Sequence, residues 1–159
     1  MADAVRISRV RGYGACEVRA TGNGWIGSKL GKKGDFVQVD ASGYIDQAAA
    51  VSAAVSTTMD LAILNNSIAA AEAAAGTKAL ATKMRIMHDD DIVEIQIVTN
   101  SDVAITAAVT HIGDAMGVYR CTNGAYVADT NATAHLICVG INLTRNTGLF
   151  KLIEANRLK

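Results

Sequence analysis

The sequence predicts a mainly β protein, either an antiparallel β-barrel or a sandwich-like domain. Short apolar runs rich in Val and Ile recur about every 8–12 residues, a spacing typical of small all-β domains. The chain has 14 glycines and no proline, so its turns are expected to use Gly, Asn and Asp. The clearest predicted strand covers residues 92–99, where apolar and more polar side chains alternate.

The two faces of the strand at residues 92–99 differ in character. Its odd-numbered side chains are three β-branched residues and a threonine, so this face is predicted to lie in the core, where each buried Val or Ile contributes roughly 1.5–3 kcal/mol. Its even-numbered face mixes two aliphatic residues with Glu94 and Gln96, as expected for a strand partly covered by a neighbour or a partner chain. The carboxylates Asp89, Asp90 and Asp91 precede the strand and are expected to form a solvated turn.

Residues 1–33 are predicted to form an N-terminal arm with a glycine-rich segment, and residues 34–159 one β-rich domain. The segment Ala4–Val10 is typical of a short extended stretch. Three arginines, Arg6, Arg9 and Arg11, give this end a basic edge. Two interpretations stay open: a solvated face, or an arm that reaches an acidic partner surface.

The glycine-rich segment contains a letter-for-letter match to the dinucleotide fingerprint G-x-G-x-x-G at residues 22–27. That motif binds phosphate only when a strand precedes it and a helix begins inside it. Residues 27–34 are a poor helix, because they contain three glycines. The favoured interpretation is a pair of tight turns, with Trp25 covering the backbone that the glycines expose.

The stretch from residue 35 to residue 81 combines a hairpin with an ambiguous alanine-rich region. Phe36–Val39 and Tyr44–Ile45 are predicted to pair across a turn at Asp40–Gly43. The alanine-rich region is expected to be a short helix or irregular chain through about Ala54. A strand near Met59–Leu64 follows, and then a short helix or extended segment before Gly76.

The rest of the chain is predicted to be strands separated by turns. A strand at Val103–Ile112 is expected to place Val103, Ile105, Ala107 and Val109 on one face. Asn123-Gly124 is the strongest two-residue hairpin signal in the chain. The remaining expected elements are strands at Met116–Thr122, Ala125–Ala128 and Ala134–Leu143, a turn at Asn146–Gly148, and a strand or short helix at Leu149–Leu158.

Composition argues against several classes of function. The 15 basic and 15 acidic residues balance, whereas binding nucleic acid needs a local excess of Lys and Arg. No apolar run approaches the roughly 20 residues of a membrane span, and no signal peptide is expected. The odd set Cys16, Cys121 and Cys138 predicts free thiols and an intracellular origin. The histidines lack zinc-like spacing, so no catalytic, cofactor or metal site is expected.

Several features match a known family in their order along residues 34–143. They are Gly34-Asp35-Phe36-Val37-Gln38-Val39-Asp40-Ala41-Ser42-Gly43-Tyr44, an Ala- and Thr-rich middle, Met84-Arg85-Ile86, Asp90-Asp91-Ile92-Val93-Glu94, Gly117-Val118-Tyr119 and Val139-Gly140-Ile141. This pattern resembles the head decoration, or capsid cement, proteins of tailed bacteriophages. The resemblance implies a barrel-like domain that is not an enzyme and docks on the outside of an assembled shell, often as a trimer. Such proteins strengthen many weak contacts through multivalency.

The resemblance implies the major capsid protein as partner and the exterior of the virion as location. On this basis the expected capsid contacts are Arg6, Arg9, Arg11 and Trp25. Small residues let backbones approach closely, so the alanine-rich region is expected to supply a subunit contact of a homotrimer. The residues expected to divide between that contact and the core are Val51, Val55, Met59, Leu61 and Ile63. The alternatives are a tail-associated or receptor-binding β-domain, and a nucleotide-binding enzyme domain that uses the glycines at residues 22–27.

Overall fold

The protein is mainly β, as the sequence predicts. The computed structural model describes residues 6–9, 17–19, 31–39, 45–56, 61–65, 67, 83–87, 91–99 and 103–153. Within these residues, a single 3₁₀ helix, η2 (Val109–His111), accompanies the strands. The strands are β1 (Arg6–Arg9), β2 (Glu17–Arg19), β3 (Phe36–Val39), β4 (Ile45–Gln47), β5 (Ala53–Ala54), β6 (Ala62–Leu64), β7 (Lys83–Ile86), β8 (Ile92–Thr99), β9 (Val103–Ala104), β10 (Ala115–Arg120), β11 (Tyr126–Asp129), β12 (Leu136–Asn142) and β13 (Thr147–Leu152).

The chain divides into two compact units that alternate along the sequence. The first unit is Met1–Tyr13, Ala49–Met59 and His88–Lys159, and the second is Gly14–Ala48 and Asp60–Met87. The predicted boundary after residue 33 stays a prediction, because most of the residues before it lie outside the described ranges.

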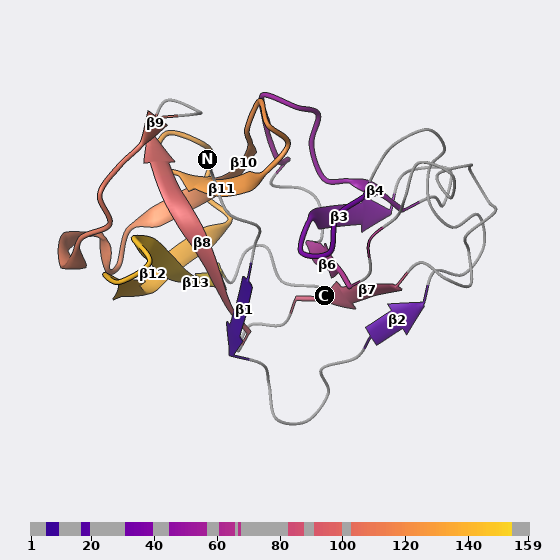
Figure 1. Ribbon diagram of the computed structural model, residues 1–159, viewed down its shortest axis with the longest axis horizontal. Helices are drawn as coiled ribbons and strands as arrows, with labels where there is room; N and C mark the ends of the chain where they lie inside the picture. The colour runs from indigo at the N-terminus through magenta and orange to yellow at the C-terminus, as the bar shows by residue number, and fades with distance from the viewer. Residues whose placement is uncertain are drawn as a thin grey trace. The chain divides into compact units, whose positions relative to one another are not determined.

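The first unit contains a small closed barrel built around β8. Following the strand pairings from β8 leads to β11, β10, β12 and β13, and β13 pairs with β8 again (Figure 1). All of these pairings are antiparallel except β8 with β11, which is parallel. The other strands of the unit extend the sheet, with β1 and β9 pairing with β8 and β5 pairing with β10. Because β13 pairs with β8, each of these five strands has a hydrogen-bonded neighbour on both sides, and the barrel has no free sheet edge along the paired residues.

Along each strand of the barrel, side chains that point into the interior alternate with side chains that point outward, and the inward ones fill the interior. On β8 the odd-numbered Val93, Ile95 and Ile97 are buried, so the predicted core face is confirmed. The other buried side chains that match them across the strand pairings are Met116, Val118, Tyr126, Ala128, Leu136, Cys138, Phe150 and Leu152.

A second apolar cluster lies on the opposite face of the same strands. It joins Val98, Tyr119, Cys121 and Val127, all of them buried. Because neighbouring side chains on a strand point to opposite faces, Val98 and Val127 lie opposite the barrel interior. At these positions β8, β10 and β11 carry apolar side chains on both faces.

The second unit is a five-stranded antiparallel sheet in the order β2-β7-β6-β3-β4. The predicted hairpin is confirmed, since β3 and β4 pair with Val37 opposite Gln47 and Val39 opposite Ile45. The strand predicted near Met59–Leu64 is confirmed as the shorter β6. Neighbouring residues such as Phe36 and Val37 are both buried, so this sheet is covered on both of its faces there.

The expected strand at Val103–Ile112 is wrong beyond Ala104. Strand β9 ends there, and the chain continues as a loop into η2. Its residues do not share one face, because Ala107 is buried whereas Val103 and Val109 are exposed. The Ile105 N–H still donates to the Ile97 carbonyl of β8 at 3.3 Å. The Ile105 carbonyl and the Ala107 N–H bond instead to the side chain of a distant residue, Asn146.

The turn between β10 and β11 also differs from the two-residue form predicted at Asn123-Gly124. The Cys121 N–H donates to the Ala125 carbonyl, and the Gly124 N–H donates to the Cys121 carbonyl. Only Gly124 has a positive φ, of 84°. This is a three-residue loop, in which a tight turn is followed by a left-handed glycine.

Asp91 corrects the expected solvated turn before β8. It is 1% exposed, and it has an interaction partner that offsets the cost of its burial. Asp89 and Asp90 lie outside the described residues. Asp91 continues the alternation of β8 and falls on the buried side with Val93, so it does not share the exposure expected for the whole acidic run.

Candidate contact surface

Four exposed apolar residues lie on β12 and on the η2 loop, which neighbours it. They are Val109, Ile112, Ile137 and Val139, with 65%, 50%, 37% and 39% of their surface exposed. Hydrogen bonds join the loop to β12, since the Gly113 N–H donates to the Cys138 carbonyl. We call these four residues the β12 strip. They make up four of the seven large exposed hydrophobic residues in the described chain, so the exposure is concentrated in one place.

The β12 strip rests on a loop that is fixed by side-chain hydrogen bonds. Asn146 accepts a hydrogen bond from the Ala107 N–H at 2.7 Å and donates one to the Ile105 carbonyl at 3.3 Å. Within the loop, His111 Nδ1 accepts a hydrogen bond from the Ala108 N–H at 3.1 Å. Asn146 has a φ of 55°, a left-handed conformation that Asn adopts more readily than most residues. The loop is therefore held in place before any partner binds.

One basic side chain stands beside the strip. Lys151 on β13 is the cross-strand neighbour of Ile137 on β12, so the two side chains lie on the same outward face. Lys151 is half-buried, and within the part of the chain that the structure describes it makes no ion pair. Asp114 precedes Ala115, the other neighbour of Ile137, and it is an exposed carboxylate in the loop that carries Ile112. The strip therefore has a basic residue beside it on β13 and an acidic residue in its loop.

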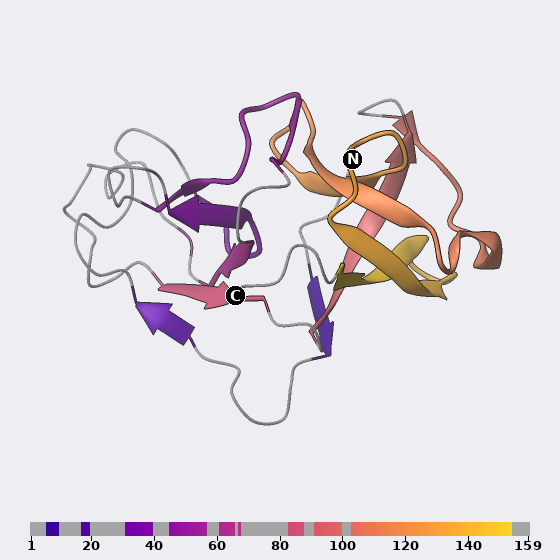
Figure 2. The same cartoon turned by 180° about the vertical axis from the view of Figure 1, so that it is seen from behind.

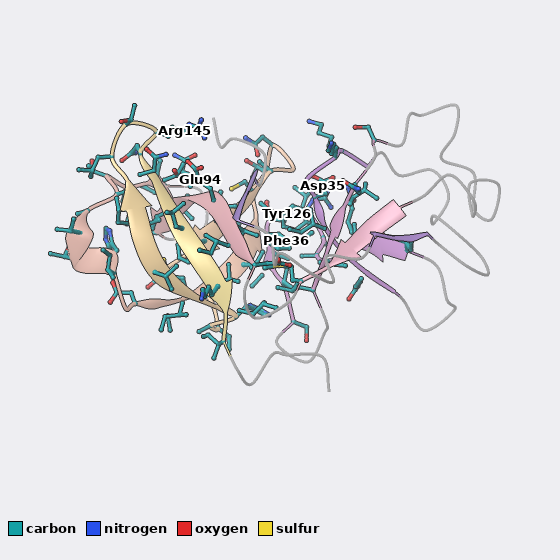
Figure 3. All side chains as sticks on the ribbon, turned by 90° about the horizontal axis from the view of Figure 1, so that it is seen from below. Asp35, Phe36, Glu94, Tyr126 and Arg145 are labelled. Atoms are coloured by element: carbon teal, nitrogen blue, oxygen red, sulfur yellow. The ribbon has the colours of Figure 1, made fainter. Side chains whose placement is uncertain are left out.

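A buried carboxylate on β8 braces the turn between β12 and β13. Glu94 Oε1 accepts hydrogen bonds from the Thr147 hydroxyl at 2.6 Å and from Asn142 Nδ2 at 3.0 Å. Its Oε2 lies 3.2 Å from Arg145 NH1, and Figure 3 shows Arg145 above Glu94 at this end of the hairpin. Glu94 is 6% exposed. Of the two covers predicted for this face of the strand, a neighbour or a partner chain, a neighbouring segment of this chain covers Glu94.

The predicted capsid-contact residues are only partly placed. Arg6 and Arg9 lie on β1, which pairs antiparallel with β8 and places Arg6 opposite Glu94. Arg11 and Trp25 lie outside the described residues, as do residues 22–27 of the nucleotide-binding alternative. The expected role of these side chains stays a prediction.

The predicted subunit-contact residues divide between surface and core. Val51 is 48% exposed in the turn before β5. Val55 in the first unit and Leu61 and Ile63 in the second are buried. Met59 lies outside the described residues. Among the four described members of this set, Val51 is the one with exposed apolar surface.

The titratable residues do not assemble a metal site in the described part of the chain, where no group of three or more His, Cys, Asp or Glu side chains could hold an ion. Cys121 and Cys138 are buried free thiols, as predicted from the odd number of cysteines, and Cys16 lies outside the described residues. Burial raises the pKa of the Cys138 thiol. Among the described residues, no helix has the length and hydropathy needed to cross a lipid bilayer.

The β12 strip was missed in the sequence, although a signal for it was present. Residues 134–143 are apolar at both odd and even positions, so one face fills the barrel and the other needs a separate cover. Leu136 and Cys138 point inward, whereas Ile137 and Val139 are exposed. Val109 and Ile112 were missed because their segment was predicted to be a strand.

Together these features define a mainly β protein whose first unit contains a closed barrel with exposed apolar residues on β12 and the η2 loop. Comparisons with protein-family models, curated proteins and solved structures found no significant match to this chain.

Proposed function

We propose that the protein is a structural virion protein that binds the outer surface of a phage capsid and stabilises it. The observation that supports the proposal is the β12 strip, a set of exposed apolar residues on β12 and on a loop whose backbone is fixed by hydrogen bonds to Asn146. A protein that cements a shell acts by burying surface against its subunits, and a fixed apolar surface reduces the ordering cost of each contact.

The resemblance of residues 34–143 to head decoration proteins supplies the identity of the partner. The proposed partner is the major capsid protein, and the proposed location is the capsid exterior after synthesis in the host cytoplasm. A shell presents many equivalent sites, so weak individual contacts gain strength when several copies are linked. For that reason we propose that the protein works as a homotrimer.

Binding to purified shells tests the proposal. Heads of the phage that carries the gene, prepared without this protein, are mixed with the purified chain and sedimented. We expect the protein to sediment with the heads up to a fixed number of copies and to raise the temperature at which they disrupt. Failure to sediment with these heads would contradict the proposal.

Purified tails from the same phage are the matched control. Sedimentation with tails and not with heads would replace the proposal with the tail-associated or receptor-binding alternative. An image of the native particle locates the protein independently of any binding assay.

A further inference from the structure

We propose that Asn123 is a site of spontaneous modification, where the Asn123-Gly124 peptide converts through a cyclic imide to isoaspartate, and that the folded loop slows this conversion. The reacting groups are the side-chain amide of Asn123 and the backbone nitrogen of Gly124, and the co-reactant is water. Both residues lie in the loop that joins β10 to β11.

The first argument is access to the reacting atoms. Asn123 is exposed and Gly124 is half-buried. Figure 2 shows their hairpin in orange, from the side opposite to Figure 1. Glycine has no Cβ atom, so no side chain beside its nitrogen hinders the approach of Asn123 Cγ. Asn131 is exposed as well, but Ala132 follows it and places a Cβ atom beside the attacking nitrogen.

The conversion balances without an oxidant or a reductant. The Gly124 nitrogen loses its proton to solvent and bonds to Asn123 Cγ, while the Cγ–Nδ2 bond breaks and Nδ2 takes up a proton and leaves as ammonia. Water then opens the imide. When it breaks the bond from the imide nitrogen to the main-chain carbonyl, the chain runs through Cγ as isoaspartate, and when it breaks the bond to Cγ, the product is aspartate. Either product adds a negative charge to a chain whose formal charges balance.

The second argument is the set of hydrogen bonds that hold the folded loop. The Gly124 N–H donates to the Cys121 carbonyl at 2.8 Å, so the nitrogen that must attack is already engaged. Asn123 Oδ1 accepts a hydrogen bond from the Ala125 N–H at 2.9 Å. Attack requires the Gly124 peptide to turn its nitrogen towards Cγ, so both hydrogen bonds have to open first. The reaction therefore proceeds from a locally open loop.

Arg120 holds the loop from its β10 side. Its Nε donates to the Gly124 carbonyl at 3.4 Å, and its NH1 donates to the Ala49 carbonyl at 3.0 Å. Its guanidinium lies 5.7 Å from the centroid of the Tyr126 ring. These contacts join the Gly124 peptide to β11 and to the segment before β5. Arg120 is therefore a positioning residue, and its loss should increase the population of the open loop.

The test follows isoaspartate at each asparagine by peptide mass spectrometry, after incubation of the protein at pH 8 with and without urea. In urea we expect Asn123 to convert faster than Asn131. In the native protein Asn123 should convert about tenfold or more slowly than in urea, because two hydrogen bonds have to open. Gly124→Ala in urea, where folding plays no part, should slow conversion at Asn123 to the rate at Asn131.

Arg120→Ala separates the effect of the folded loop from the chemistry of the peptide. It should speed native conversion and leave the rate in urea unchanged. The matched control is Arg145→Ala, which removes an arginine from the turn between β12 and β13 and should change neither rate. Thermal melting establishes that both variants are folded.

Each outcome decides one part of the inference. If Asn123 converts no faster than Asn131 in urea, the modification site is overturned. If the native and urea rates at Asn123 are equal in the wild type, the protection by the folded loop is overturned, whether or not Arg120→Ala folds. If folded Arg120→Ala converts at the native rate of the wild type, the role of Arg120 is overturned. Head binding is measured separately, so none of these outcomes contradicts the proposed function.

Discussion

Gly148 shows how little space the barrel interior leaves at the level of a single residue. A Cβ atom added there would lie 2.4 Å from Phe150 Cε2 and 3.1 Å from Ile97 Cδ1. Phe150 is buried, so its ring has no room to move away. We expect Gly148→Ala to lower the free energy of unfolding by about 1–3 kcal/mol through overpacking, measured by urea denaturation.

Gly140 is the matched control for Gly148. A Cβ atom added at Gly140 would meet the tip of the Leu149 side chain at 3.2 Å, and Leu149 is only half-buried. The side chain can rotate away, so Gly140→Ala should change stability by less than about 1 kcal/mol. Equal effects at the two glycines would show that the interior is not filled as described.

Cys138 is a second residue whose behaviour follows from burial. Desolvation raises the pKa of its thiol, and the charge of Asp114 acts in the same direction, so the reactive thiolate is disfavoured in the folded state. We expect iodoacetamide at pH 8 to label Cys138 far more slowly in the native protein than in urea. Peptide mass spectrometry measures the labelling, and equal rates in both conditions would contradict the burial.

The same shift has a consequence for stability. The pKa of this thiol is higher in the folded protein than in the unfolded chain, where it is about 8.5. Its contribution to the free energy of unfolding is therefore complete below about pH 8.5 and is lost as the pH rises towards the folded pKa. The free energy of unfolding should therefore fall as pH rises above about 8.5. Cys138→Ala should show a shallower decline, and an unchanged decline would assign the effect to other groups.

At the scale of elements, Asn146 connects the β12–β13 turn to the loop that carries the β12 strip. Asn146→Ala removes both of its hydrogen bonds to the loop and places alanine at a φ of 55°. We expect a loss of about 1–3 kcal/mol of stability. The Ala107 amide should also exchange with solvent faster, as measured by hydrogen exchange.

Asn146→Gly separates the two causes of the expected loss of stability, which are the missing hydrogen bonds and the strain of alanine at a positive φ. Glycine adopts the left-handed conformation without strain but supplies no side-chain hydrogen bond. Fast exchange of the Ala107 amide should persist in this variant, while part of the lost stability returns. If the amide stays protected in both variants, Asn146 does not hold the loop.

The Glu94 brace predicts a contrast between two of its partners. The Thr147 hydroxyl is buried with Glu94, so Thr147→Val leaves the carboxylate short of a donor and should cost about 1–3 kcal/mol. The Arg145 side chain is 53% exposed, and Arg145→Ala should cost no more than about 1 kcal/mol. Urea denaturation measures both. A larger effect at Arg145 would mean that the ion pair dominates the brace.

At the scale of the whole molecule, the proposed homotrimer is open to direct measurement. Multi-angle light scattering at micromolar concentration should give three times the mass of the chain. Val51 is the exposed residue among the described members of the predicted contact set, so Val51→Glu should shift the protein towards monomer, while Val103→Glu should not. A stable wild-type monomer that still binds heads would mean that trimers form only on the shell.

The sequence by itself determined the fold class, most strand positions and the inward face of β8. These depend on local alternation and turn residues, which act within a few positions of one another. The alternation along β8 puts Val93, Ile95 and Ile97 on one face, and because that face is apolar it is the one buried in the core.

Only the tertiary structure decided how the strands pair and which surface stays open. The parallel pairing of β8 with β11 and the return of β13 to β8 join residues far apart in the chain, so no local pattern encodes them. After β9, Asn146 binds the loop backbone through hydrogen bonds across about 40 positions, a contact that no local pattern encodes. The β12 strip exists for the same reason: barrel closure covers one face of β12 and leaves the other exposed.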